Sequence, residues 1–152
     1  PMFGRHLVQN SLAAIAVGLE FGLSIETIRG ALASFGGVKR RLEVIGEAQG
    51  VTVMNDYGHH PTEIRATLRA IKECFADAVN RILVVFQPHR YTRTAALLDE
   101  FAGAFHAADT VHVTQIYAAS ETPIEGVSGE SLAERIHAFG HRGASFASRR
   151  SK

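Results

Sequence analysis

The sequence predicts an α/β fold: a mostly parallel sheet with helices on both faces, preceded by two helices that have no strand beside them. From residue 42 onward, short apolar runs typical of strands alternate with amphipathic helical segments, an order that builds parallel sheets through right-handed crossovers. The run I-L-V-V-F at 82–86 is unbroken, as expected for a strand covered on both faces. The first forty residues carry helical spacing alone.

Composition limits the class of protein. A chain of 152 residues, 46% hydrophobic and 20% charged, can bury a sizeable core and is not disordered. Its apolar stretches are too short to span a membrane, and a net charge of +1 gives no electrostatic reason to expect nucleic acid or membrane as a partner. The one cysteine, Cys74, excludes an internal disulfide, fits a reducing cytoplasm, and is expected to be buried in a helix.

The first two predicted elements are helices. Asn10 is expected to cap a helix over 11–21, and Ser24 a second helix over 25–34. Gly36 and Gly37 end this part, and the basic stretch 39–41 that follows is a plausible hinge. The chain opens on proline and stops without an obvious terminal element, so we expect a piece of a longer protein.

The later elements follow in alternation. Strands starting at residue 42 and covering 51–54 are joined through a turn at Gln49 and Gly50. A helix over 61–75 begins with Pro61 and has Glu63 in its first turn. After the strand at 82–86, the pattern predicts a helix over 94–106, a strand over 110–114, a helix over 131–139 and a weak strand over 144–146.

Two polar clusters follow predicted strands, where ligands bind in sheets of this kind. The first is N-D-Y-G-H-H-P-T-E at 55–63, between a strand and a helix N-terminus. Two interpretations compete with a binding role: His60 or Thr62 merely caps the helix, or His59 and His60 bind a metal. The metal interpretation is weak, because adjacent side chains rarely chelate one ion from a loop.

The second cluster is Q-P-H-R-Y-T-R-T at 87–94. Arg90 and Arg93 lie one helical turn apart and, with His89, predict a site for a carboxylate or phosphate. We expect both clusters to share one edge of the sheet. Arg41 is either a solvated hinge residue or a phosphate ligand, and the residues alone leave this open. The sequence has no glycine-rich phosphate loop of its own.

Taken together, these motifs resemble those of the Mur ligase family. The strings at 56–63 and 86–94 resemble D-Y-[AG]-H-H-P-T-E and F-Q-P-H-R-[YF]-[ST]-R-T. Shorter likenesses are found at 4–14, 38–43 and 116–124, so the resemblance covers nearly the whole chain in order. One position departs from the pattern: Leu7 stands where the family has asparagine, and leucine cannot hydrogen-bond a nucleotide.

The resemblance implies part of an ATP- and Mg²⁺-dependent amide-bond ligase of peptidoglycan precursor synthesis. Such an enzyme joins L-alanine to UDP-N-acetylmuramate through an acyl phosphate in the cytoplasm. Residues 1–38 would be the last helices of a central ATP-binding domain, and 39–152 a truncated C-terminal Rossmann-like domain. The partner would be the rest of the ligase chain, which would hold the metal ligands. The chain alone is expected to be inactive.

The same resemblance assigns roles to residues. It implies ATP binding by His6, Asn10, Arg41 and Asp56, substrate binding by Tyr57, His59, His89, Arg90 and Arg93, catalytic roles for Arg41 and His59, and no metal ligand in this chain. Two alternatives remain. One is a stand-alone nucleotide- or anion-binding module without catalysis. The other is a ligase that recycles a muramyl tripeptide, which shares the H-H-P string but usually has Phe-Ala in place of Tyr57 and Gly58.

Overall fold

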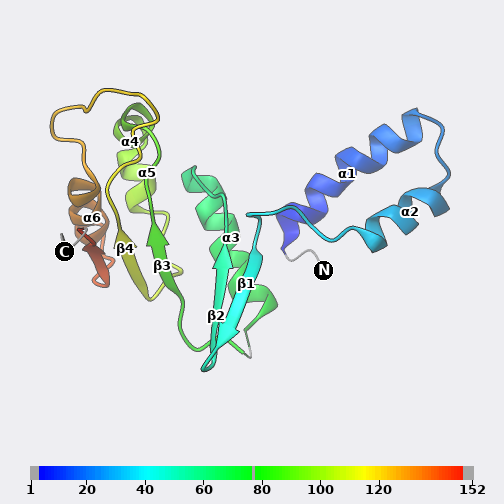
Figure 1. The fold of residues 1–152 in the computed structure, drawn as a ribbon, viewed down its shortest axis with the longest axis horizontal. Coiled ribbons are helices and arrows are strands. Elements are labelled where there is room, and N and C mark those ends of the chain that lie inside the picture. Colours follow the sequence, from blue (N-terminus) through cyan, green and yellow to red (C-terminus); the bar gives the residue numbers. More distant parts are fainter. Residues whose placement is uncertain (1–3, 77, 149–152) are drawn as a thin grey trace.

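The computed structural model describes residues 4–76 and 78–148 (Figure 1). Helices and strands alternate in the order expected of an α/β protein. In chain order the elements are α1 (Arg5–Glu20), α2 (Ile25–Ser34), β1 (Glu43–Ala48), β2 (Val51–Asn55), α3 (Pro61–Cys74), β3 (Leu83–Phe86), α4 (Tyr91–Ala96), α5 (Leu98–Ala102), β4 (Thr110–Val113), α6 (Gly129–Ala138) and β5 (Ala144–Phe146).

The parallel sheet has the order β3-β4-β5, which confirms the predicted α/β class. Its buried face, with Val111 and Val113 fully buried, joins side chains of α3, α5 and α6 in one apolar core. On the other face of β3, Leu83 and Val85 are 52% and 68% exposed. The expectation that this strand is covered on both faces is therefore wrong for the described residues, because the helices that pack on the sheet share a single core.

Strands β1 and β2 form an antiparallel hairpin of their own. Its turn residues Gln49 and Gly50 both have positive φ, 52° and 74°, as a two-residue primed turn requires. The hairpin was predicted, but a single continuous sheet was not found: hydrogen bonding within the described residues divides the strands into two sheets. The hairpin stands beside α3, which lies between it and the parallel sheet in the view of Figure 1.

Helices α1 and α2 pack against each other at one end of the molecule, away from the parallel sheet (Figure 1). Ser24 caps α2 through the Thr27 amide, as predicted. Helix α1, in contrast, begins at Arg5 after Gly4, so Asn10 lies inside the helix and is not its cap. The apolar spacing indicates the helix only from residue 11, whereas Gly4, with φ of 99°, already allows the chain to enter the helix.

Two further element boundaries and the exposure of Cys74 differ from expectation. The helix expected over 94–106 begins earlier and breaks at Leu97 into α4 and α5, which lets Leu97 and Leu98 pack on the core. Helix α6 begins two residues early, because Ser128 is its cap and Ser131 completes the capping box. Cys74 ends α3 and is exposed, not buried. Among the helices of the described ranges, none has the length and apolarity needed to cross a membrane.

Candidate active site

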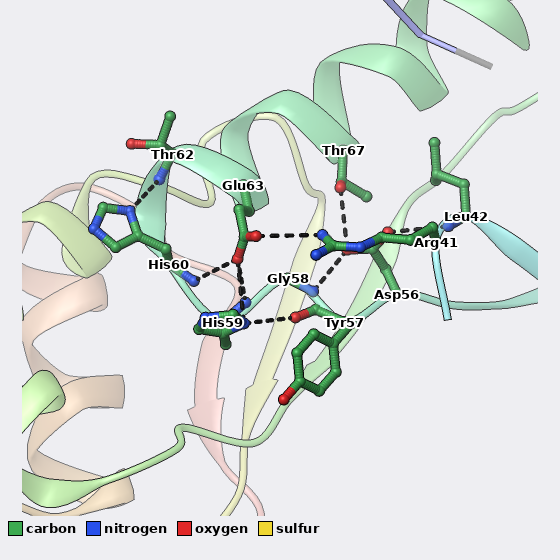
Figure 2. Close-up of polar contacts among 10 residues, drawn as sticks. All are labelled: Arg41, Leu42, Asp56, Tyr57, Gly58, His59, His60, Thr62, Glu63 and Thr67. Atoms are coloured by element: carbon green, nitrogen blue, oxygen red, sulfur yellow. Dashed lines mark hydrogen bonds and ion pairs between the residues drawn. The ribbon is translucent and has the colours of Figure 1, made fainter. Parts of the chain in front are cut away.

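The loop after β2 is anchored by Asp56, whose two carboxylate oxygens are both engaged (Figure 2). Oδ1 accepts hydrogen bonds from the Gly58 amide at 2.8 Å and the Thr67 hydroxyl at 3.2 Å. Oδ2 accepts from the Leu42 amide at 3.0 Å. One side chain thus joins the linker before β1, the loop and α3. Any bond to a ribose hydroxyl would have to use the acceptor capacity that these contacts leave.

Glu63 is a second anchor for the same loop (Figure 2). Its Oε2 accepts from the amides of His59 and His60 at 3.0 and 3.1 Å, and its Oε1 faces Nη1 of Arg41 at 3.3 Å. Burial would raise the pKa of Glu63, but hydrogen bonds from the His59 amide and Arg41, with the charges of both residues, lower it below the usual range. The carboxylate is therefore ionised and holds Arg41 near the loop.

His59 is held in a defined orientation. Its Nδ1 lies 3.0 Å from the Tyr57 carbonyl oxygen and 3.3 Å from Oε2 of Glu63. Both partners only accept, so this geometry requires the proton on Nδ1 and, in the neutral ring, leaves Nε2 as the acceptor. The Tyr57 ring meets the His59 ring edge-on at 5.1 Å and lies under the Arg41 guanidinium at 5.8 Å.

His60 caps α3, which is the structural role that the sequence offered as an alternative to ligand binding. Its Nδ1 accepts from the Thr62 amide at 3.3 Å, and with Glu63 it completes a capping box at the start of α3. Within the described residues, no group of three or more histidine, cysteine or acidic side chains is placed to hold a metal ion. We therefore treat His60 as a helix cap.

The segment after β3 is fixed by the segment after β4. The Arg90 amide donates to the Tyr117 carbonyl at 2.9 Å, and the Tyr117 amide donates to the Pro88 carbonyl at 2.8 Å. The rings of His89 and Tyr117 stack with centroids 5.2 Å apart. Arg90, with φ of 75° and ψ of 133°, adopts a conformation that favours glycine. A strained non-glycine residue at a strand end is a feature of functional sites.

The two clusters meet electrostatically at His89. Burial, followed by the positive charges of Arg93, Arg90 and His59, lowers its pKa below the ordinary value, with a smaller opposite effect of Glu121. The charge of His59, in the loop after β2, therefore acts on the segment after β3. The Nδ1 atom of His89 is buried and has no hydrogen-bond partner among the described residues.

Sequence reasoning missed two acidic residues of this edge. Glu63 was noted only as a first-turn residue, although the H-H-P-T-E string carried the capping-box signal. Glu121 accepts from the Thr92 amide at 3.0 Å and the Thr92 hydroxyl at 2.7 Å, and these bonds lower the pKa of Glu121. Glu121 lies in the string at 116–124 that resembles the family, but its pairing with Thr92 was not predicted, because the contact joins segments 29 residues apart.

His6 and Asn10 are not brought into this network. Both lie on α1, and in the described part of the chain no hydrogen bond or ion pair connects either to the loop after β2. The surface depressions found between α6 and β5 and near the end of α3 contain none of the candidate residues. The side chains of Arg41, His59 and Glu63 are 38%, 33% and 30% exposed, so this part of the candidate site is open to solvent.

The chain matches known proteins along its length. The family described as "Mur ligase, glutamate ligase domain" matches residues 40–151. The UDP-N-acetylmuramate–L-alanine ligase of Solibacter usitatus is 57% identical over 143 residues, which are 94% of this chain and 30% of that protein. The chain therefore spans about 30% of the length of such relatives.

Solved structures agree with this match. The crystal structure of the UDP-N-acetylmuramate–alanine ligase of Thermotoga maritima is 32% identical with a TM-score of 0.75, over 96% of this chain and 30% of that chain. A murein peptide ligase from Psychrobacter arcticus is 29% identical with a TM-score of 0.67, over 99% and 30% of the two chains. Matched in sequence over residues 40–151 and in fold over nearly its whole length, the chain belongs to the Mur ligase family.

Proposed function

We propose that this chain is part of a UDP-N-acetylmuramate–L-alanine ligase, which uses ATP to form an amide bond during peptidoglycan precursor synthesis. In this proposal residues 1–38 are the last helices of the central ATP-binding domain, and 39–152 belong to the C-terminal ligase domain. The level of identity to relatives of that name, 57% over 143 residues, supports this assignment.

The observation that carries the proposal is the convergence of cationic and imidazole side chains at one edge. Arg90, Arg93 and His59 all act on His89, and Glu63 brings Arg41 to the His59 loop. The substrates proposed for this edge are anionic: a nucleotide phosphate, a muramyl carboxylate and the carboxylate of L-alanine. Guanidinium groups bind both anion types through paired, charge-assisted hydrogen bonds.

Arg41 suits the role of a phosphate ligand. One nitrogen of its guanidinium contacts Glu63, and the side chain is 38% exposed, so its other donors can reach a ligand. ATP would supply the phosphoryl group that converts the muramyl carboxylate into an acyl phosphate, with release of ADP. Arg41 would bind the phosphate and stabilise its negative charge during transfer. The residues that bind Mg²⁺ are expected in the part of the ligase outside this chain.

The second half-reaction involves the other cluster. Arg90 and Arg93 would hold the carboxylate of L-alanine, with His89 and Tyr57 beside them. The free Nε2 of His59 is suited to accept a proton from the alanine ammonium group. The amine would then attack the acyl carbonyl, forming the amide bond and releasing phosphate.

A tripeptide-recycling ligase is the alternative with a structural relative. The murein peptide ligase of Psychrobacter arcticus superposes on this chain with a lower TM-score, 0.67 against 0.75. Tyr57 and Gly58 also favour the L-alanine ligase. Comparing L-alanine with a free tripeptide as the amine substrate, each with UDP-N-acetylmuramate, would distinguish the two activities.

The test uses the full-length ligase that carries this sequence. Arg93→Ala should raise the KM for L-alanine by at least about tenfold, because a charge-assisted carboxylate contact is lost. Arg135→Ala is the matched control: Arg135 pairs with Asp99 at 2.7 Å on an exposed surface of α5 and α6. Equal KM values for L-alanine in wild type and Arg93→Ala would contradict the proposed role.

The isolated chain provides a second test. We expect it to release no ADP from ATP when UDP-N-acetylmuramate and L-alanine are present, because the phosphate loop and metal ligands are not in its sequence. Turnover by the isolated chain would contradict the proposed division of labour. Binding of ATP by the chain without any loss of ligase activity in full-length Arg41→Ala and Arg93→Ala variants would instead favour a stand-alone binding module.

A further inference from the structure

We infer that Glu63 is a positioning residue that holds the Arg41 side chain in the orientation needed to meet the ATP phosphate. This inference rests on the proposed function, because it takes Arg41 to be the phosphate ligand. Glu63 itself would touch neither ATP nor the reacting atoms. It would act through Arg41, across 22 residues of sequence.

The two carboxylate oxygens of Glu63 contact different partners. Oε2 accepts the His59 and His60 amides and completes the capping box of α3. Oε1 takes no part in the cap and faces Nη1 of Arg41 at 3.3 Å. A capping residue needs only one acceptor oxygen, so the contact with Arg41 is separate from the local requirement of the helix. This separation allows the two roles to be tested independently.

The backbone on both sides of Arg41 is also held in place. Arg40 and Leu42 both have positive φ, 61° and 48°, which is unfavourable for residues with side chains. The Leu42 amide is held by Asp56, and the Arg40 carbonyl accepts from the Tyr57 amide at 2.6 Å. Asp56 therefore fixes the backbone at Arg41, while Glu63 fixes the guanidinium.

Charge explains why an anchor is needed. Arg41 follows Lys39 and Arg40 in an exposed stretch, so neighbouring positive charges repel it and its long side chain has many rotamers. The lowered pKa of Glu63 keeps the carboxylate ionised at neutral pH. The ion pair with Glu63 and the stacking over Tyr57 select one orientation, with the remaining donors of Arg41 open to a ligand. An arginine that is already oriented binds phosphate with less loss of side-chain entropy.

The test is a double-mutant cycle in the full-length ligase. Glu63→Gln keeps one oxygen for the capping amides and places an uncharged amide beside Arg41. It should raise the KM for ATP or lower kcat/KM for ATP by about tenfold, and leave the KM for L-alanine unchanged. The same change made in an Arg41→Ala background should lower kcat/KM for ATP no further, because the guanidinium that Glu63 positions is gone. Asp99→Asn, which removes the exposed pair with Arg135, is the matched control and should leave both KM values unchanged.

The outcomes distinguish the proposed phosphate role of Arg41 from the positioning role of Glu63. Normal ATP kinetics in Arg41→Ala would overturn the proposed phosphate role itself. An Arg41→Ala defect combined with a fully multiplicative effect of Glu63→Gln would overturn the positioning role alone. If Glu63→Gln lowers Tm strongly, Glu63→Asp is the second variant: it keeps the charge for the cap but is one methylene too short for Arg41. A folded Glu63→Asp enzyme with wild-type kcat/KM for ATP would also overturn the inference.

Discussion

The parallel-sheet region and the N-terminal region bury their apolar side chains to very different extents. In residues 82–146 the large side chains Phe101, Phe105, Leu132 and Ile136 are at most 1% exposed. In residues 4–55 the only described hydrophobic side chains in the buried class are Ile28 and Leu42. The many apolar side chains of that region that are exposed are Val8, Leu12, Val17, Leu19, Phe21, Leu23, Ile25, Phe35, Val38, Val44, Ile45, Val51 and Val53.

Residues 82–146 therefore form a packed core, whereas residues 4–55 leave many apolar side chains exposed to solvent. So many exposed apolar side chains in one region are typical of a surface on which other protein packs, which agrees with a chain that spans about 30% of the length of its relatives. The candidate site lies at the border between the regions. Arg41 and Asp56 come from the side with the exposed surface, whereas Arg90 and Arg93 are carried by the packed sheet.

The largest effect is expected from a change in the packed region. Phe101→Ala removes a ring that is 1% exposed and packs on Phe86 with centroids 5.6 Å apart. It should lower the free energy of unfolding by about 3–5 kcal/mol, through lost burial and a residual cavity. Val17→Ala on α1, where valine is 57% exposed, should change it by less than about 0.5 kcal/mol. Urea titrations of both variants of the chain measure this, and equal losses would remove the distinction between the regions.

A substitution at Arg90 is expected to change the free energy of unfolding by a smaller amount and in the opposite direction. Arg90→Gly should stabilise the chain by about 1 kcal/mol, because glycine adopts φ of 75° and ψ of 133° without strain. In the full-length ligase the same change should raise the KM for L-alanine, since the guanidinium is lost. Thermal unfolding and steady-state kinetics together check this opposition. A variant that is both less stable and fully active would show that Arg90 serves the fold and not the substrate.

The pH dependence of stability should reveal how closely the two clusters approach. Because the folded-state pKa of His89 is lowered, the neutral ring favours folding and protonation opposes it. Its contribution is therefore present above the unfolded-state pKa of about 6.5 and is lost as the pH falls from there through the lowered folded-state value. His89→Gln should reduce this loss between pH 7 and pH 5 in urea titrations. An unchanged pH profile would mean that neither burial nor the charges of Arg93, Arg90 and His59 lower the pKa of His89 in the folded chain.

Local signals predicted the elements well, and long-range contacts account for what they missed. Pro61 and Glu63 marked the start of α3, and the apolar runs predicted each strand that the described residues form. The uncovered face of β3 was not predictable, because the run at 82–86 shows apolarity but not which elements cover it. Tertiary contacts likewise placed Glu121 on Thr92 and Glu63 on Arg41. Neither pairing leaves a periodic trace in the sequence.

The smallest expected effect tests whether the hairpin behaves independently of the packed sheet. Gln49 adopts φ of 52° in the turn between β1 and β2, a conformation that asparagine tolerates better than glutamine. Gln49→Asn should stabilise the hairpin by about 0.5 kcal/mol, which slows hydrogen exchange of its amides about twofold. Amides of the parallel sheet, such as that of Val111, should exchange at the wild-type rate, because the hairpin shares no sheet hydrogen bond with β3, β4 or β5 in the described residues. Equal slowing in both sheets would mean that the two regions unfold as one unit. The exposed apolar side chains of residues 4–55 could then not be explained by a contrast with an independently stable packed region.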